Sequence, residues 1–136
     1  MTFPSTDRFT GKILRQWLTP QIQSGARIIG GREPDNGRVI VVTMSAGAGP
    51  SMDGLFDQPG FQITARGAQN NLDDAEAIAY DVDTILLHAP TSFYMAGVYV
   101  DFIGRTGGSP QQLPFQDAQS RFVFTCNYYA SVSVGL

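Results

Sequence analysis

The stretch from residue 59 to residue 90 constrains the fold most, because its apolar periodicity changes once along its length. From Phe61 to Arg66, apolar and polar residues alternate, which is typical of a half-buried β-strand. After residue 71 the apolar residues recur at every third or fourth position and form one stripe of a helix: Leu72, Ala75, Ile78, Ala79, Val82, Ile85 and Leu86. The sequence therefore predicts a strand that leads into an amphipathic helix, and this helix needs a sheet to cover.

Signals at both ends support this helix. Asn70 or Asn71 can cap the N-terminus. Acidic residues follow in the first turn, where the helix dipole favours negative charge: Asp73, Asp74 and Glu76. Pro90 marks the end, because the residue before a proline is pushed out of helical geometry.

The rest of the chain predicts one more helix and several more strands. An apolar stripe with helical spacing precedes Pro20: Phe9, Ile13, Leu14, Trp17 and Leu18. Further extended segments are expected at 27–32, 38–44, 97–105 and 121–134. We therefore expect an α+β fold, as a single domain over residues 1–136. It would have a mostly antiparallel sheet of about five strands, with the two helices packed on one face.

The sequence says less about what covers the other face of the expected sheet. Strict alternation in 97–105 predicts one set on one face and a second set on the other: Val98, Val100 and Phe102 against Tyr99, Asp101 and Ile103. The apolar run Val39–Val42 and the aromatic pair Tyr99 and Tyr129 suggest a subunit contact on the face without helices.

Two connections are rich in Gly and Pro but also carry large apolar residues. Residues 45–58 contain Met52, Leu55 and Phe56, which a solvated loop does not need. We expect this loop to dock on a neighbour or partner, although Leu55 and Phe56 could instead pack on their own core. The second connection, 106–119, contains Leu113 and Phe115 and is expected to form a long hairpin arm.

Charge is unevenly distributed along the chain. Residues 1–45 hold six Lys or Arg against three acids, a net +3, and residues 46–136 hold three against nine, a net −6. A basic part and an acidic part would complement each other in a head-to-tail ring. Ordinary scatter on the surface of a monomer is the alternative.

The sequence contains few of the groups that catalysis requires. It has one histidine, His88, at the end of a helix, where it complements the dipole, and one cysteine, Cys126. We therefore expect no catalytic residues, no bound metal and no cofactor, and we do not expect an enzyme. Asp53 and Asp57 could at most bind a hard cation weakly. No stretch reads as a membrane span, and the opening residues lack the apolar region of a signal peptide.

The order of these elements resembles that of a known family. A short extended segment ends in GREPD, and an all-apolar strand and a Gly/Pro-rich loop follow it. Then comes P-x-FQI-x-x-RG, with an acidic-starting helix after it. This pattern, over roughly residues 10 to 130, resembles the small tail-terminator proteins of long-tailed bacteriophages, within the broader group of minor capsid and head–tail completion proteins.

The resemblance implies a structural protein of the virion, made in the host cytoplasm and placed in the neck region at the head-proximal end of the tail. A homohexameric ring would cap the tail tube, end its polymerisation and offer a face to the head-completion proteins. Genomic DNA would pass through the lumen without specific binding. The candidate lumen acids are Asp73, Asp74 and Asp81. The candidate contacts are the loop Gly49–Phe56 with Met52 and Leu55, the segment Gly107–Phe115 with Leu113, and the arginines Arg27, Arg32 and Arg38.

Two other functions stay open at this point. The chain could be a neighbouring neck protein, a stopper or completion protein, rather than a terminator. It could also be a small α+β ligand-binding domain or enzyme, with Tyr99, Asp101 and His88 as polar groups in a pocket between sheet and helices. The lack of a coherent acid–base set argues against the second alternative.

Overall fold

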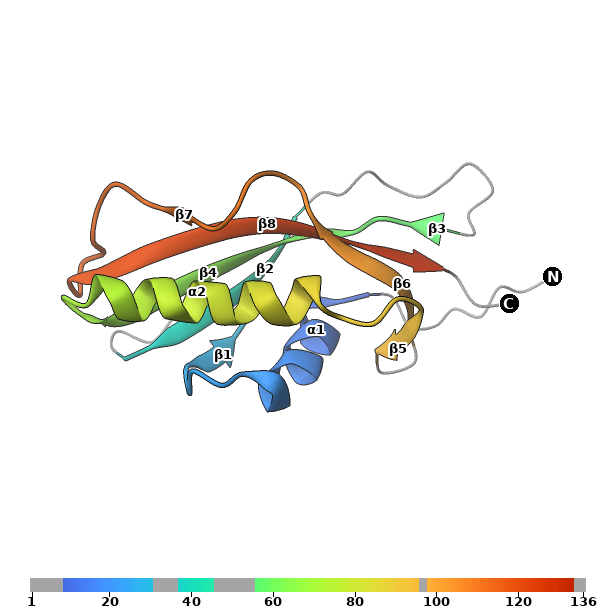
Figure 1. Ribbon diagram of the computed structural model, residues 1–136, viewed down its shortest axis with the longest axis horizontal. Coiled ribbons are helices and arrows are strands. Elements are labelled where there is room, and N and C mark those ends of the chain that lie inside the picture. Colours follow the sequence, from blue (N-terminus) through green and yellow to red (C-terminus); the bar gives the residue numbers. More distant parts are fainter. Residues whose placement is uncertain (1–8, 31–36, 46–55, 96–97, 134–136) are drawn as a thin grey trace.

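The computed structural model describes residues 9–30, 37–45, 56–95 and 98–133. A long helix, α2 (Leu72–Leu87), lies along one face of a twisted sheet, as Figure 1 shows. The shorter helix α1 (Gly11–Leu18) runs into a 3-10 turn, η1 (Thr19–Gln21), and packs on the same core. The fold is therefore α+β with two helices and a mostly antiparallel sheet, as the sequence predicts.

The main strand order is β1 (Arg27–Ile29), β2 (Val39–Ser45), β4 (Gly60–Gln69), β8 (Arg121–Ser133), β6 (Val98–Arg105) and β5 (Phe93–Met95). Two short strands, β3 (Phe56–Asp57) and β7 (Gln111–Gln112), also pair with β8. Every extended segment that the sequence predicts appears as a strand. The additional strands β3, β5 and β7 have two or three residues each, too few to show a periodicity.

Of the two candidate asparagines, Asn71 caps the start of α2. The side chain of Asn71 accepts a hydrogen bond from the Asp74 backbone N–H at 3.0 Å. Asn70 instead takes the left-handed conformation, with φ 57°, in the turn after β4. The helix ends at Leu87, and the His88 N–H donates to the Thr84 carbonyl. The capping signals in the sequence therefore place both ends closely.

The core lies between the helices and one face of the sheet. Leu14 and Leu18 of α1 and Ile78, Val82 and Leu86 of α2 are all fully buried there. Each such side chain contributes about 1.5–3 kcal/mol when it leaves water. Aromatic rings fill the space between elements. Phe61 stacks on Tyr128 with ring centroids 5.5 Å apart, and Trp17 stacks on Phe93 at 5.4 Å.

The long strand β8 organises the sheet, because β3, β4, β6 and β7 all pair with it. The connection 106–119, expected as a long hairpin arm, forms only the short strand β7 and is bonded along the edge of β8. Its N–H groups at Thr106, Leu113 and Asp117 donate to carbonyls of β8 at 3.0, 2.9 and 2.9 Å. This segment is therefore part of the sheet edge.

One expected face assignment is wrong. The register between β6 and β8 shifts between Val100 and Phe102, which is a β-bulge at Asp101. An extra residue reverses the alternation beyond it. Ile103 consequently joins Val98 and Val100 in the core, while Phe102 is 40% exposed on the face opposite the helices.

Candidate interaction surfaces

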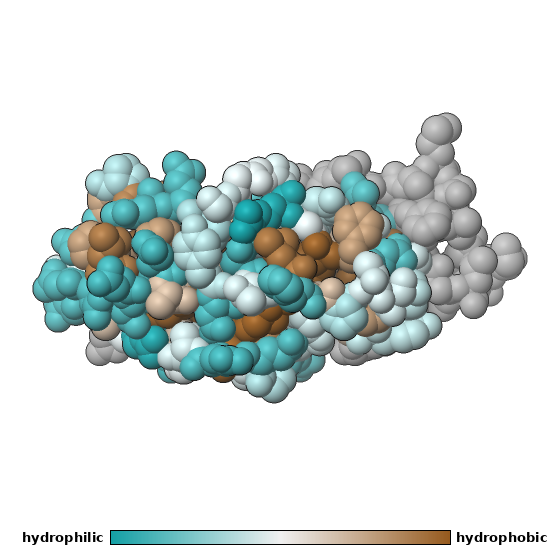
Figure 2. All heavy atoms as spheres, in the orientation of Figure 1, coloured by the Kyte–Doolittle hydropathy of each residue, from teal (hydrophilic) through white to brown (hydrophobic). Residues whose placement is uncertain are grey.

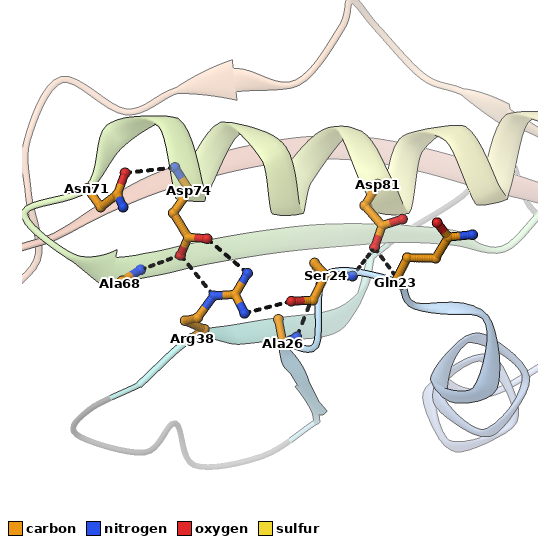
Figure 3. A network of polar contacts seen from close by, with 8 residues as sticks. All are labelled: Gln23, Ser24, Ala26, Arg38, Ala68, Asn71, Asp74 and Asp81. Atoms are coloured by element: carbon orange, nitrogen blue, oxygen red, sulfur yellow. Dashed lines mark hydrogen bonds and ion pairs between the residues drawn. The ribbon is translucent and has the colours of Figure 1, made fainter.

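Asp74, in the first turn of α2, holds the helix to the strands beneath it (Figure 3). Asp74 forms an ion pair with Arg38 at 2.9 Å and accepts a hydrogen bond from the Ala68 N–H at 2.7 Å. Arg38 also donates to the Ser24 carbonyl at 2.6 Å. Burial alone would raise the pKa of Asp74, but Arg38 and the Ala68 N–H outweigh it, so the pKa is lowered.

The other two candidate lumen acids differ in their surroundings. Asp81 accepts hydrogen bonds from the backbone N–H groups of Gln23 and Ser24, at 3.0 and 3.1 Å (Figure 3). Asp73 is exposed in the first turn of α2. Asp74 and Asp81 thus have internal roles that sequence reasoning missed, and a role in a lumen stays a prediction for all three.

The candidate contact residues fall into two groups. Arg32, Met52 and Leu55 lie outside the described residues, as does the side chain of Phe56, although its backbone belongs to β3. Arg27 is exposed on β1, Arg38 is paired with Asp74, and Leu113 is partly buried beside β8. Phe115 keeps 60% of its surface exposed. Arg27 and Phe115 are therefore the members that the structure leaves accessible.

A second ion-pair cluster lies on the face of the sheet that carries no helix. Asp117 accepts from the Arg66 Nη1 at 2.9 Å and from the Arg121 Nε at 2.8 Å. Arg121 also donates to the Gly37 carbonyl at 3.0 Å. Burial would raise the pKa of Asp117, but the backbone N–H of Arg121, the Arg121 side chain and the Gln119 N–H lower it overall. The cluster joins β4, β8 and the turn before β2.

A buried polar cluster lies between α2 and the sheet. Asp83 is only 5% exposed and accepts from the Tyr128 hydroxyl at 2.8 Å and from the Arg105 Nε at 2.9 Å. Burial, then Cys126 and Asp83, raise the pKa of Tyr128, so its hydroxyl stays a donor. The sequence could have indicated the burial of Asp83, because it lies three residues before Leu86 and therefore on the apolar stripe of α2.

Large aromatic side chains gather on the face of the sheet without helices. Tyr94 of β5 meets Tyr99 of β6 edge-to-face, with ring centroids 5.0 Å apart. Phe102 of β6 meets Tyr129 of β8 in the same manner at 5.8 Å. Tyr94 is 71% exposed. We call this set, together with Asp101, the aromatic surface.

Asp101 lies within the aromatic surface because of the bulge. Its carboxylate accepts from the Ser133 hydroxyl at 2.9 Å, and Ser133 pairs with Tyr99 across the two strands. Asp101 therefore points to the same face as Tyr99 and Phe102. Arg66 and Arg121, the arginines of β4 and β8, both bond to Asp117. Figure 2 shows the opposite, helix-covered side, where polar side chains predominate and apolar ones form small separate groups.

The polar groups expected for a pocket do not converge. Tyr99 and Asp101 lie on the face without helices, whereas His88 ends α2 on the other side of the sheet, with its Nδ1 2.9 Å from the Thr84 carbonyl. Within the described ranges, no group of three or more His, Cys, Asp or Glu side chains could hold a metal ion. In the same ranges no helix has the length and apolar character to span a membrane.

No protein-family model matches this chain, and no curated protein matches it either. Function is therefore inferred from the surfaces and charges described above.

Proposed function

We propose that this protein is a structural assembly protein of a phage virion, similar to a tail terminator. The aromatic surface is the observation that best supports a role in assembly. Tyr94, Tyr99, Phe102 and Tyr129 form two ring pairs on a sheet face that neither helix covers. Aromatic side chains are enriched at protein–protein contacts, and exposed apolar clusters mark such contacts.

The mechanism would be binding rather than a chemical reaction. Copies of the chain would form a homohexameric ring whose one face matches the end of the tail tube, while its other face does not accept another tube ring. The tube grows by head-to-tail stacking, so a ring that offers no matching second face ends the stack. The free face would then meet the head-completion proteins.

The exposed carboxylates of α2 fit a passage for DNA. Asp73 and Glu76 are exposed on α2, and Asp81 is half-exposed beside them. A lumen lined by carboxylates would repel the phosphate backbone and let DNA slide without specific binding. The ring, its lumen and its place in the neck follow from the resemblance, and the surfaces of the chain are compatible with them.

The test is polymerisation of purified tail tube protein with and without this protein. We expect substoichiometric amounts to shorten the tubes, and we expect electron microscopy to show the protein at one tube end only. Glu76→Gln removes one exposed carboxylate of α2 and keeps the size of the side chain. This variant should still cap tubes, because the proposed lumen charge acts on DNA and not on the tube.

If tube lengths stay the same and the protein does not bind tube ends, the terminator role is wrong. Binding to purified head-completion proteins without any effect on tubes would instead identify a neighbouring neck protein. Tail length in virions made without this protein gives a second readout, with abnormally long tails expected.

A further inference from the structure

The ion pairs inside the fold account for some of the positively charged side chains but not for all of them. Four arginines are paired with aspartates: Arg38 with Asp74, Arg66 and Arg121 with Asp117, and Arg105 with Asp83. Three cations have no acidic partner among the described residues: Lys12, Arg15 and Arg27. They all lie in residues 9–30, which contain no acid at all. Residues 9–30 therefore present positive charge that no described acid compensates.

Of these cations, Arg27 is the one free to reach a partner on the sheet face. Arg15 folds back over its own chain, since a Cβ atom added at Gly30 would lie 1.8 Å from the Arg15 Nη1. Lys12 is on α1, on the helix side. Arg27 is exposed and pairs with Val39, which shares a face with Arg66. Arg27 thus lies on the face without helices, at the β1 end of the strand order.

The aromatic surface lies at the other end of the strand order, on β5, β6 and β8. Its one acid, Asp101, has no cationic partner among the described residues and is flanked by Tyr99 and Phe102. An acid beside exposed tyrosine rings suits a guanidinium, which stacks on ring faces and forms forked hydrogen bonds with a carboxylate. The two ends of the sheet are therefore complementary in chemistry.

We propose that the aromatic surface of one copy receives Arg27 of the next copy, in a heterologous, head-to-tail contact. This inference rests on the proposed function, which requires a ring, and it specifies which surfaces join the subunits. Arg27 stacks on Tyr94 or Tyr99 and pairs with Asp101. Because the donor and acceptor surfaces occupy opposite ends of one sheet, each copy offers both, and repetition of the contact can close a ring.

Complementation between two variants tests this contact. Arg27→Ala removes the donor, and Tyr94→Lys places a repelling charge on the acceptor. Both positions are exposed, so both variants should fold. We expect each variant alone to self-associate at least about tenfold more weakly than the parent protein, the size of effect that loss of an aromatic or arginine anchor has at an interface.

An equimolar mixture should then form dimers and stop there. One intact Arg27 and one intact aromatic surface remain for a single contact, and both outer ends of that dimer are blocked. Sedimentation velocity measures the species, in free solution and on tube ends. The matched control is Lys12→Ala, which removes an exposed charge on α1, away from the aromatic surface, and should associate like the parent protein.

Every other result counts against the contact. It is overturned if either variant associates normally, if the mixture fails to dimerise, or if Lys12→Ala by itself blocks association, which would place the contact on α1. If the parent protein and the variants all form rings and cap tubes, the proposed function stands and only this contact is wrong. If the complementation succeeds but rings leave tube growth unchanged, the contact stands and the terminator role fails. If the parent protein associates neither in solution nor on tube ends, both the contact and the terminator role are wrong.

Discussion

At the scale of single residues, Asp83 shows how a buried charge can serve packing. It occupies the apolar side of α2, yet its carboxylate is bonded to Arg105 and to the Tyr128 hydroxyl. A buried carboxylate costs free energy unless such partners satisfy it. The neighbouring Cys126 is also buried, and burial raises the pKa of its thiol. The thiol therefore stays protonated.

Replacing Asp83 should destabilise the protein. Asp83→Ala leaves the buried Tyr128 hydroxyl without its acceptor, and an unsatisfied buried donor costs about 1–3 kcal/mol. Urea unfolding followed by circular dichroism measures the loss.

Combining Asp83→Ala with Tyr128→Phe provides the control. The double variant removes the stranded hydroxyl and keeps the ring that stacks on Phe61. It should recover part of the lost free energy of unfolding. If the double variant is as unstable as the sum of the two single ones, the hydroxyl is not the cause.

At the scale of elements, the close approach of α2 to β4 depends on Gly67. A Cβ atom at this position would lie 2.6 Å from the backbone nitrogen of Ala75 and 2.9 Å from its Cβ. Both neighbours belong to α2, so the helix itself would have to move. The Ala68 N–H next to Gly67 bonds to Asp74, which fixes the same end of the helix.

Gly67→Ala should therefore lower the free energy of unfolding, by about 1–3 kcal/mol, the usual cost of overpacking a core. Thermal unfolding measures it. Gly107→Ala is the matched control, because a Cβ there would meet nothing within 4 Å. Equal stability of the two variants would show that α2 adjusts without cost.

At the scale of the whole molecule, two aspartates join segments that are far apart in the sequence. Asp74 links α2 to the start of β2, and Asp117 links β4, β8 and, through Arg121, the turn at Gly37. The pKa of each carboxyl is lowered in the folded protein. Their contribution to stability is therefore present above the unfolded pKa, about 3.9. It is lost as the pH falls through the lower folded values.

We expect the free energy of unfolding to stay nearly constant down to about pH 5 and to fall below about pH 4. Chemical unfolding at about pH 6 and about pH 3 measures the difference. Asp117→Asn should be less stable at the higher pH but should lose less on acidification, because one of the two titrating groups is gone. A variant with the same pH dependence as the parent protein would exclude Asp117 as a source of the acid sensitivity.

Local sequence patterns were sufficient for the elements. The change of period near residue 71, the asparagine cap and the long alternation in 121–134 predict α2, its start and β8, because capping and periodicity depend on near neighbours in the chain. Partners such as Arg38 with Asp74, or Asp83 with Tyr128, are 36 and 45 residues apart, so no local pattern contains them.

The tertiary structure alone decided which side chains reach the surface. The bulge at Asp101 arises from the pairing of β6 with β8, and it moves Phe102 from the expected inner face to the outer one. It thereby completes the aromatic surface on which the proposed contact depends. The sequence by itself determined the α+β architecture and the acid-poor N-terminal part. The register of two strands, which is a property of their pairing and not of either one, decided which aromatic side chains share the face without helices.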